Sequence, residues 1–128
     1  GLNPAAALPK RNADDMTRRG SAMKEIKAFI HQNRAADVVH ALHSSGLCRS
    51  GCNLSLTDVA GTLKSLGSKE QSFSVEFGES LVNEVKLELV CDDSLVDNAI
   101  ELIRDHARTG QAVSGWIYVS DITNSYRI

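Results

Sequence analysis

Two cysteines separated by three residues are the part of this sequence best suited to chemistry. Cys48 and Cys52 enclose Arg49, a serine and a glycine. A short loop that contains glycine can bring two thiols within disulfide range, and the cation of Arg49 favours the reactive thiolate. The pattern predicts either a redox-active disulfide or two reduced thiols in a tight turn. A reducing compartment favours the second interpretation.

Nearby histidines raise the alternative of a metal site. His40 and His43 lie three residues apart on one flank of an expected helix, and with the two cysteines they could complete a zinc site. The same spacing is ordinary for solvent-facing helix residues, which is the simpler interpretation, so no metal ligands are assigned. The third cysteine, Cys91, alternates with leucine and valine and is expected to be a small core residue.

The sequence carries no known catalytic motif. It contains no nucleophile elbow, Walker loop or His–Glu metal motif. The paired acids Asp92 and Asp93 precede an expected helix, where capping explains them better than acid–base chemistry. We therefore expect a protein that is not an enzyme and has no catalytic residues.

Composition limits the class of protein. The chain has 128 residues, 42% of them hydrophobic, and a formal net charge of −2. These values are typical of one soluble domain and argue against a nucleic-acid partner, which would favour a basic surface. No apolar run approaches the roughly 18 residues of a membrane-spanning helix, so we expect no membrane insertion. With no apolar run after the paired arginines near the N-terminus, a cytoplasmic location is expected.

Periodicity predicts the elements that position these residues. Residues 1–22 have no regular period and are expected to be a tail, either flexible or added to the natural chain. The rest, residues 23–128, alternates between strand and helix periods. Strands are expected over 24–31, 54–61, 84–91 and 116–119, helices over about 34–44 and 94–108, and a long loop or projecting hairpin over 62–83.

The order of these elements predicts an α+β, ferredoxin-like βαββαβ domain. Its antiparallel four-stranded sheet has two helices on one face and leaves the other face open. Phe29, Val59, Val90 and Ile117 are expected to point to the open face and make it partly apolar. Burial of that face against other copies of the chain is the simplest solution.

Several segments carry a resemblance to a known family. They are MKEIKAFI, DVVHALHSSG, VKLELV followed by two aspartates, ARTGQAVSGWIYV and a terminal Tyr-Arg-Ile. The chain from Met23 to Ile128 resembles the PII signal-transduction proteins, in their divergent PII-like branch. The resemblance implies a homotrimer that binds adenine nucleotide in clefts between subunits. It also implies that residues 62–83 form an arm, similar to the T-loop, that docks a target protein such as a transporter or an enzyme.

The resemblance further implies a set of nucleotide-binding residues. Amides beside glycine can approach phosphate closely, and arginine can bind it bidentately. The implied set is Ser55, Gly61, Val90, Arg108, Gly110, Ser114, Gly115, Trp116 and Arg127. Family members that bind ATP strongly carry lysines where this chain has Gln111 and Trp116. Because phosphate charge is then under-neutralised, AMP or ADP is expected to bind more tightly than ATP.

Other departures concern the ligand that the arm senses. Ser65 replaces a metal-holding glutamine, Glu84 replaces a lysine, and Phe77 replaces a tyrosine that some members have modified. We therefore do not expect 2-oxoglutarate sensing. PII-like proteins associated with bicarbonate transport and carboxysome gene clusters suggest bicarbonate as a second ligand, with Arg127 or Arg108 as its first candidates.

Two alternatives are also compatible with the sequence. A metal-responsive trimer that resembles the divalent-cation-tolerance proteins would use Cys48 and Cys52. Slow nucleotide hydrolysis in the cleft is less favoured, because the lysines are absent. No obligatory cofactor is expected in any of these cases.

Overall fold

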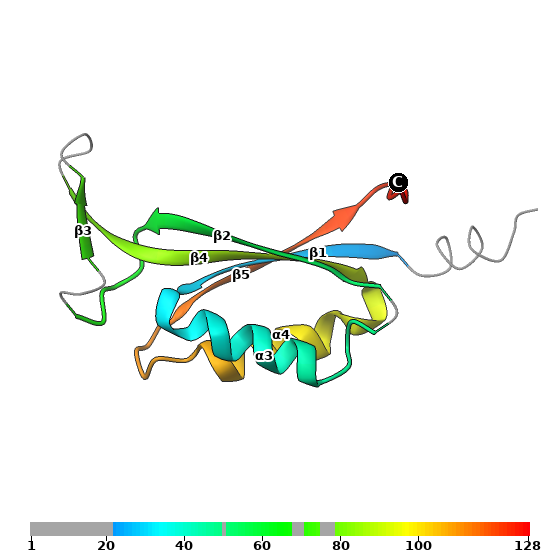
Figure 1. Cartoon of the computed structure of the whole chain (residues 1–128), viewed down its shortest axis with the longest axis horizontal. Coiled ribbons are helices and arrows are strands. Elements are labelled where there is room, and N and C mark those ends of the chain that lie inside the picture. Colours follow the sequence, from blue (N-terminus) through cyan, green and yellow to red (C-terminus); the bar gives the residue numbers. More distant parts are fainter. Residues whose placement is uncertain (1–21, 50, 68–70, 75–78) are drawn as a thin grey trace, which may run out of the picture.

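A twisted antiparallel sheet forms one layer of the molecule and two helices form the other (Figure 1). The computed structural model describes residues 22–49, 51–67, 71–74 and 79–128, so the expected tail lies outside the described residues except for Ala22. The strands are β1 (Met23–His31), β2 (Asn53–Gly61), β3 (Gln71–Ser74), β4 (Glu79–Asp92) and β5 (Gly115–Ile122). The helices are α3 (Ala35–Ser44) and α4 (Val96–Ala107), each preceded by a short 3-10 turn, η1 (Gln32–Arg34) and η3 (Asp93–Leu95).

The strand order confirms the predicted fold. The main sheet runs β2-β4-β1-β5 with every pair antiparallel, and both helices lie on one face of it. This is the ferredoxin-like α+β arrangement expected from the order of elements. The expected strands and helices differ from the observed ones by a few residues at their ends, except where β4 begins early.

The core lies between the sheet and the helices. Alternate residues of β1 and β4 point into it, and α3 and α4 contribute one apolar stripe each. Each large aliphatic side chain buried there contributes about 1.5–3 kcal/mol relative to exposure. The fully buried residues include Ile26, Ala28, Ile30, Val38, Leu42, Leu87, Leu89, Ala99 and Ile103. Cys91 is also fully buried and is a core residue, as predicted.

The arm contains a hairpin. β4 begins at Glu79, five residues before the expected start of the strand, and β3 pairs with this early part, from Gln71 opposite Val82 to Ser74 opposite Glu79. Figure 1 shows this hairpin projecting beyond the end of the main sheet. Of the two expectations for residues 62–83, the projecting hairpin is therefore the observed one.

One expectation about the open face is wrong. Ile117 pairs directly with Ala28 and packs against the core, so it faces the helices. The dense run of β-formers in β5 has no alternation to reveal its faces, and a shift of one residue exchanges them. Instead, Trp116 and Tyr118 point to the open face, each about half exposed.

Candidate functional site

A hydrogen-bonded network fixes the loop that joins α4 to β5. The backbone N–H of Thr109 donates to Ser114 Oγ at 3.0 Å, and the Thr109 hydroxyl lies 3.0 Å from the same oxygen. Gly110 has a φ of 87°, a left-handed conformation that glycine adopts without a steric penalty. The network holds the two ends of the loop together, so its backbone presents a preformed surface.

A cavity of about 640 Å³ lies between this loop, α4 and β5. Its lining combines apolar side chains such as Ile103 and Ile117 with the guanidinium-bearing Arg104 and Arg108. Arg108 is exposed and lies 3.8 Å from Asp105, an ion pair that contributes about 0–1 kcal/mol at such a surface. An apolar wall with two nearby cations suits a planar ligand that carries an anionic group.

The base of the arm is fastened by a buried carboxylate. Glu84 is only 3% exposed, and its Oε2 accepts the backbone N–H of Leu63 at 2.9 Å. Gly61 faces this carboxylate so closely that a Cβ at position 61 would collide with it. The glycine that begins the arm therefore makes room for Glu84, a role the sequence did not reveal.

A second contact joins the α4–β5 loop to the arm. Nε2 of Gln111 donates to the backbone carbonyl oxygens of Lys64, at 3.3 Å, and Ser65, at 3.4 Å. The Ser65 hydroxyl in turn donates to the carbonyl oxygen of Gly67 at 2.6 Å. Movement in the α4–β5 loop can therefore reach the first residues of the arm directly.

Comparison with known proteins identifies the family. The family model described as nitrogen regulatory protein P-II matches residues 23–128. The chain belongs to the PII family. A nitrogen regulatory protein P-II from Rhodospirillum rubrum is 35% identical over 106 residues, which are 83% of this chain and 91% of that protein. Nitrogen regulatory protein P-II 1 from Methanothermobacter thermautotrophicus is 30% identical over 106 residues, covering 83% and 89%.

PII proteins are regulators rather than enzymes, and in general they are trimers that bind nucleotides and partner proteins. In the part of this PII chain that the structure describes, no helix has the length and apolar character needed to cross a bilayer.

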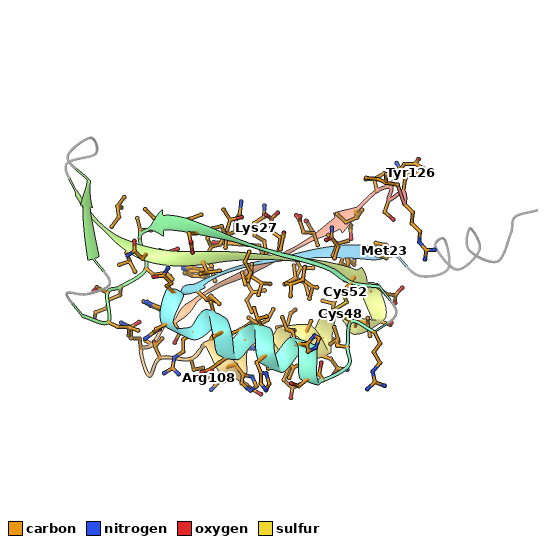
Figure 2. The ribbon with its side chains drawn as sticks, in the orientation of Figure 1. Met23, Lys27, Cys48, Cys52, Arg108 and Tyr126 are labelled. Atoms are coloured by element: carbon orange, nitrogen blue, oxygen red, sulfur yellow. A yellow bond between two sulfur atoms is a disulfide. The ribbon has the colours of Figure 1, made fainter. Side chains whose placement is uncertain are left out.

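The predicted nucleotide residues of this PII chain fall in three places. One group surrounds the α4–β5 loop and comprises Arg108, Gly110, Ser114, Gly115 and Trp116. A second group lies toward the edge of the sheet that is opposite β5. It comprises Ser55 and Gly61 on edge strand β2, with Val90 on the neighbouring strand β4. Arg127 follows β5 in the C-terminal segment, at the end of the sheet opposite Arg108 (Figure 2 labels the neighbouring Tyr126).

One chain brings these groups only partly together: the contact of Gln111 places the α4–β5 loop near the start of the arm after Gly61, but the sheet separates the remaining residues. β2 and β5 form opposite edges of the main sheet, with β4 and β1 between them. Packing also requires glycine at position 115, because a Cβ there would collide with the carbonyl oxygen of Phe29.

Sequence reasoning missed three polar residues of this region: Arg104, Gln111 as a contact to the arm, and Glu84 as its anchor. Arg104 precedes Arg108 by four residues, which would place both on one flank of the helix expected over 94–108, and that spacing was a usable signal. In the structure α4 ends at Ala107 and Arg108 follows it in an extended conformation. Gln111 and Glu84 act on backbone groups distant in sequence, for which the sequence offers no signal. Phe77 lies outside the described residues.

The cysteine pair is joined in the structure. Cys48 and Cys52 form a disulfide, and in this form neither sulfur is a thiolate that could bind a metal ion. His40 lies beside Ser44, with 3.3 Å between Nε2 and Oγ. Within the described ranges, no three His, Cys, Asp or Glu side chains converge in a way that could hold a metal ion. The alternative of a metal-responsive trimer therefore gains no ligand set from these residues.

Proposed function

We propose that this PII protein is a signalling homotrimer that binds an adenine nucleotide in clefts between neighbouring copies. The observation that carries the proposal is the division of the expected contact residues between the β2–β4 part of the sheet and the segments that precede and follow edge strand β5. In a closed ring, the β5 edge and the α4–β5 loop of one copy can meet the β2 edge of the next, which would complete the cleft.

The open face of the sheet supports assembly. Phe29 and Tyr118 make an edge-to-face contact with ring centroids 6.1 Å apart, and Trp116 lies beside Phe29 on the adjacent strand. The helices lie on the opposite face, so these aromatic side chains stay partly exposed in one chain. Figure 2 shows Lys27 on the same open face. A mixed apolar and charged face of this kind suits burial against other copies.

The charges near the cleft support a preference for AMP or ADP over ATP. Arg104 and Arg108 line the cavity, but Gln111 adds no charge, and the arm base holds the buried carboxylate of Glu84. Each additional phosphate adds negative charge that needs neutralisation. A site with few cations therefore loses more binding affinity for ATP than for AMP.

Bicarbonate is the proposed second ligand. It is a small planar anion whose oxygens match the two parallel N–H donors of a guanidinium. Arg108 suits this role because it is exposed and its contact with Asp105 is long. Arg127 is the alternative, and it is also exposed. The ligand state would pass through Gln111 to the arm, which would act on a transporter or an enzyme.

Isothermal titration calorimetry tests this proposal. AMP, ADP, ATP and cyclic AMP are titrated into the full chain, with and without bicarbonate and with 2-oxoglutarate as a negative control. We expect AMP or ADP to bind most tightly, and bicarbonate to strengthen that binding. Binding of ATP at least about tenfold tighter than both, a gap of ~1.4 kcal/mol, would contradict the preference. If none of the nucleotides bound measurably, the proposed function would be overturned.

Variants locate the site in the same experiment. Arg108→Gln and Arg127→Gln should each weaken adenylate binding. Arg34→Gln serves as the matched control, because Arg34 lies in η1 outside all three groups of expected contacts. Equal effects of all three variants would point to a general loss of charge rather than to a site. Sedimentation of each variant verifies that the trimer is intact.

A further inference from the structure

We infer that Cys48 and Cys52 form a thiol–disulfide switch that orders the start of edge strand β2 and thereby tunes nucleotide binding. The second half of this inference rests on the proposed function. The observation behind it is that the structure joins two cysteines in the short connection between α3 and β2. Figure 2 shows the pair at the end of α3 remote from the arm, on the helix side of the sheet.

The backbone of the connection turns tightly between the two cysteines and has hydrogen bonds of its own. The N–H of Arg49 donates to the carbonyl oxygen of Gly46 at 3.2 Å, and the N–H of Gly51 donates to that of Cys48 at 3.3 Å. Gly46 and Gly51 have φ values of 72° and 122°, which other residues rarely adopt. The Cα atoms of the cysteines are 4.7 Å apart. We therefore expect the turn to keep the two thiols near one another after reduction, so that the bond can re-form.

Access distinguishes this pair from the third cysteine. Cys48 and Cys52 are half-buried, and the intervening Arg49 and Gly51 are exposed. Cys91 is fully buried, and burial is the main cause that raises the pKa of its thiol. A soluble thiol reagent can reach the loop but not Cys91, so redox chemistry is confined to one place in this chain.

The switch lies directly before an element of the proposed cleft. Cys52 precedes Asn53, the first residue of β2, which pairs with Val90. Ser55 follows two residues later on the same edge strand. The disulfide anchors this start to a loop packed on the core, so reduction should let the first residues of β2 open more often.

The chemistry is thiol–disulfide exchange with a low-molecular-weight disulfide such as oxidised glutathione. The thiolate of one cysteine attacks a glutathione sulfur, forms a mixed disulfide and expels one glutathione thiolate. The second cysteine thiolate then attacks the protein sulfur of that mixed disulfide. The Cys48–Cys52 bond forms, and a second glutathione leaves. The dithiol is oxidised, one glutathione disulfide is reduced to two thiols, and the protein's two protons pass to them through solvent.

The first test measures the redox equilibrium. The full chain is equilibrated in glutathione buffers of graded composition, denatured in acid, alkylated and weighed by mass spectrometry. We expect conversion between three alkylated cysteines and one, with the unlabelled pair assigned to the peptide around residues 48–52. A pair that stays fully reduced, or fully oxidised, across the whole series would overturn the inference. Cys91→Ala serves as the matched cysteine control and should convert at the same glutathione ratio.

The second test measures the consequence for β2. Hydrogen exchange of residues 47–56 should be faster in the reduced protein and in a Cys48→Ser, Cys52→Ser double variant than in the oxidised protein. Equal exchange in both redox states would overturn the switch, whether or not nucleotide binds. We further expect adenylate to bind about fivefold more weakly to the reduced protein, because the strand must be ordered on binding.

The outcomes separate this inference from the proposed function. Adenylate binding of equal strength in both states would reject the coupling and leave the proposed function intact. Absence of adenylate binding in both states would reject the proposed function. The hydrogen-exchange rates of residues 47–56 would then show by themselves whether reduction loosens the start of β2.

Discussion

The carboxylate of Glu84 fills the space that a side chain at Gly61 would need. The two residues lie on neighbouring strands, where the arm leaves the sheet, and the same carboxylate accepts the N–H of Leu63. A small residue on one strand and an acid on the next thus anchor the first turn of the arm. This arrangement leads to the first two predictions.

Gly61→Ala should destabilise the protein. The added methyl group would displace the carboxylate at the end of the Glu84 side chain and remove its hydrogen bond to Leu63, which costs about 1–3 kcal/mol for a buried group. The free energy of unfolding in urea measures the effect. Gly67→Ala is the control, because a Cβ at that position meets no atom within 4 Å. Equal losses in the two variants would contradict the role of the Gly61–Glu84 contact.

Two replacements of Glu84 should distinguish the contribution of its hydrogen bond to stability from the contribution of its charge. Glu84→Ala leaves the N–H of Leu63 without its acceptor, which costs about 1–3 kcal/mol for a buried group. Glu84→Gln keeps an acceptor oxygen and should lose less stability. Hydrogen exchange of residues 62–67 should rise in the alanine variant. A glutamine variant as unstable as the alanine variant would show that the charge, and not the hydrogen bond, matters.

Gln111→Ala should release the beginning of the arm. It removes the donor that holds the carbonyl oxygens of Lys64 and Ser65. A neutral hydrogen bond contributes ~1 kcal/mol, so trypsin should cleave after Lys64 about three- to tenfold faster. Ala112→Ser, a change at the exposed neighbouring position, should leave the rate unchanged. An unchanged rate in Gln111→Ala would show that the contact does not restrain the arm.

Stability should fall at alkaline pH because of Cys91. Burial, followed by the charges of Asp92 and Asp93, raises the pKa of its thiol in the folded state. The folded protein therefore holds this proton more tightly than the unfolded chain, whose thiol titrates near ~8.5. The resulting stabilisation is complete below that pH and declines as pH rises above it.

The comparison between the wild type and Cys91→Ala isolates this contribution, since other groups titrate equally in both. The free energies of unfolding of the two proteins, measured in urea from pH 7 to 10 with Cys48–Cys52 oxidised, should converge as pH rises. Parallel curves would contradict the assignment.

The sequence predicted those elements whose burial leaves a regular pattern. Strand 24–31 could be found because Ile26, Ala28 and Ile30 alternate with residues of the opposite face, and the helices could be found from their apolar stripes. The hairpin of β3 and the early part of β4 are rich in serine and pair through their backbones. Such pairing leaves no side-chain period, so its extent could not be predicted.

The candidate site was predicted mainly from the family resemblance. The family resemblance pointed to the α4–β5 loop, whose glycines and Arg108 are residue types that suit close approach to an anion. Glu84 resembles any solvent-facing acid in an alternating strand. Its burial depends on Gly61 across the strand pair and on a backbone donor twenty-one positions away, which only the folded chain brings near.

The unbroken course of β4 has a mechanical consequence. This strand has 14 residues, and at ~3.3 Å per residue it reaches about 46 Å, from the arm hairpin through the middle of the sheet to the turn before α4. The early part of β4 thus belongs to the arm, and its later part is paired with β2 on one side and β1 on the other. Because β4 is one unbroken strand, a partner that tilts the arm hairpin would transmit the force directly to the main sheet. Changes in the length of the hairpin should be tolerated in steps of two residues, because an odd step would exchange the two faces of the strands beyond it.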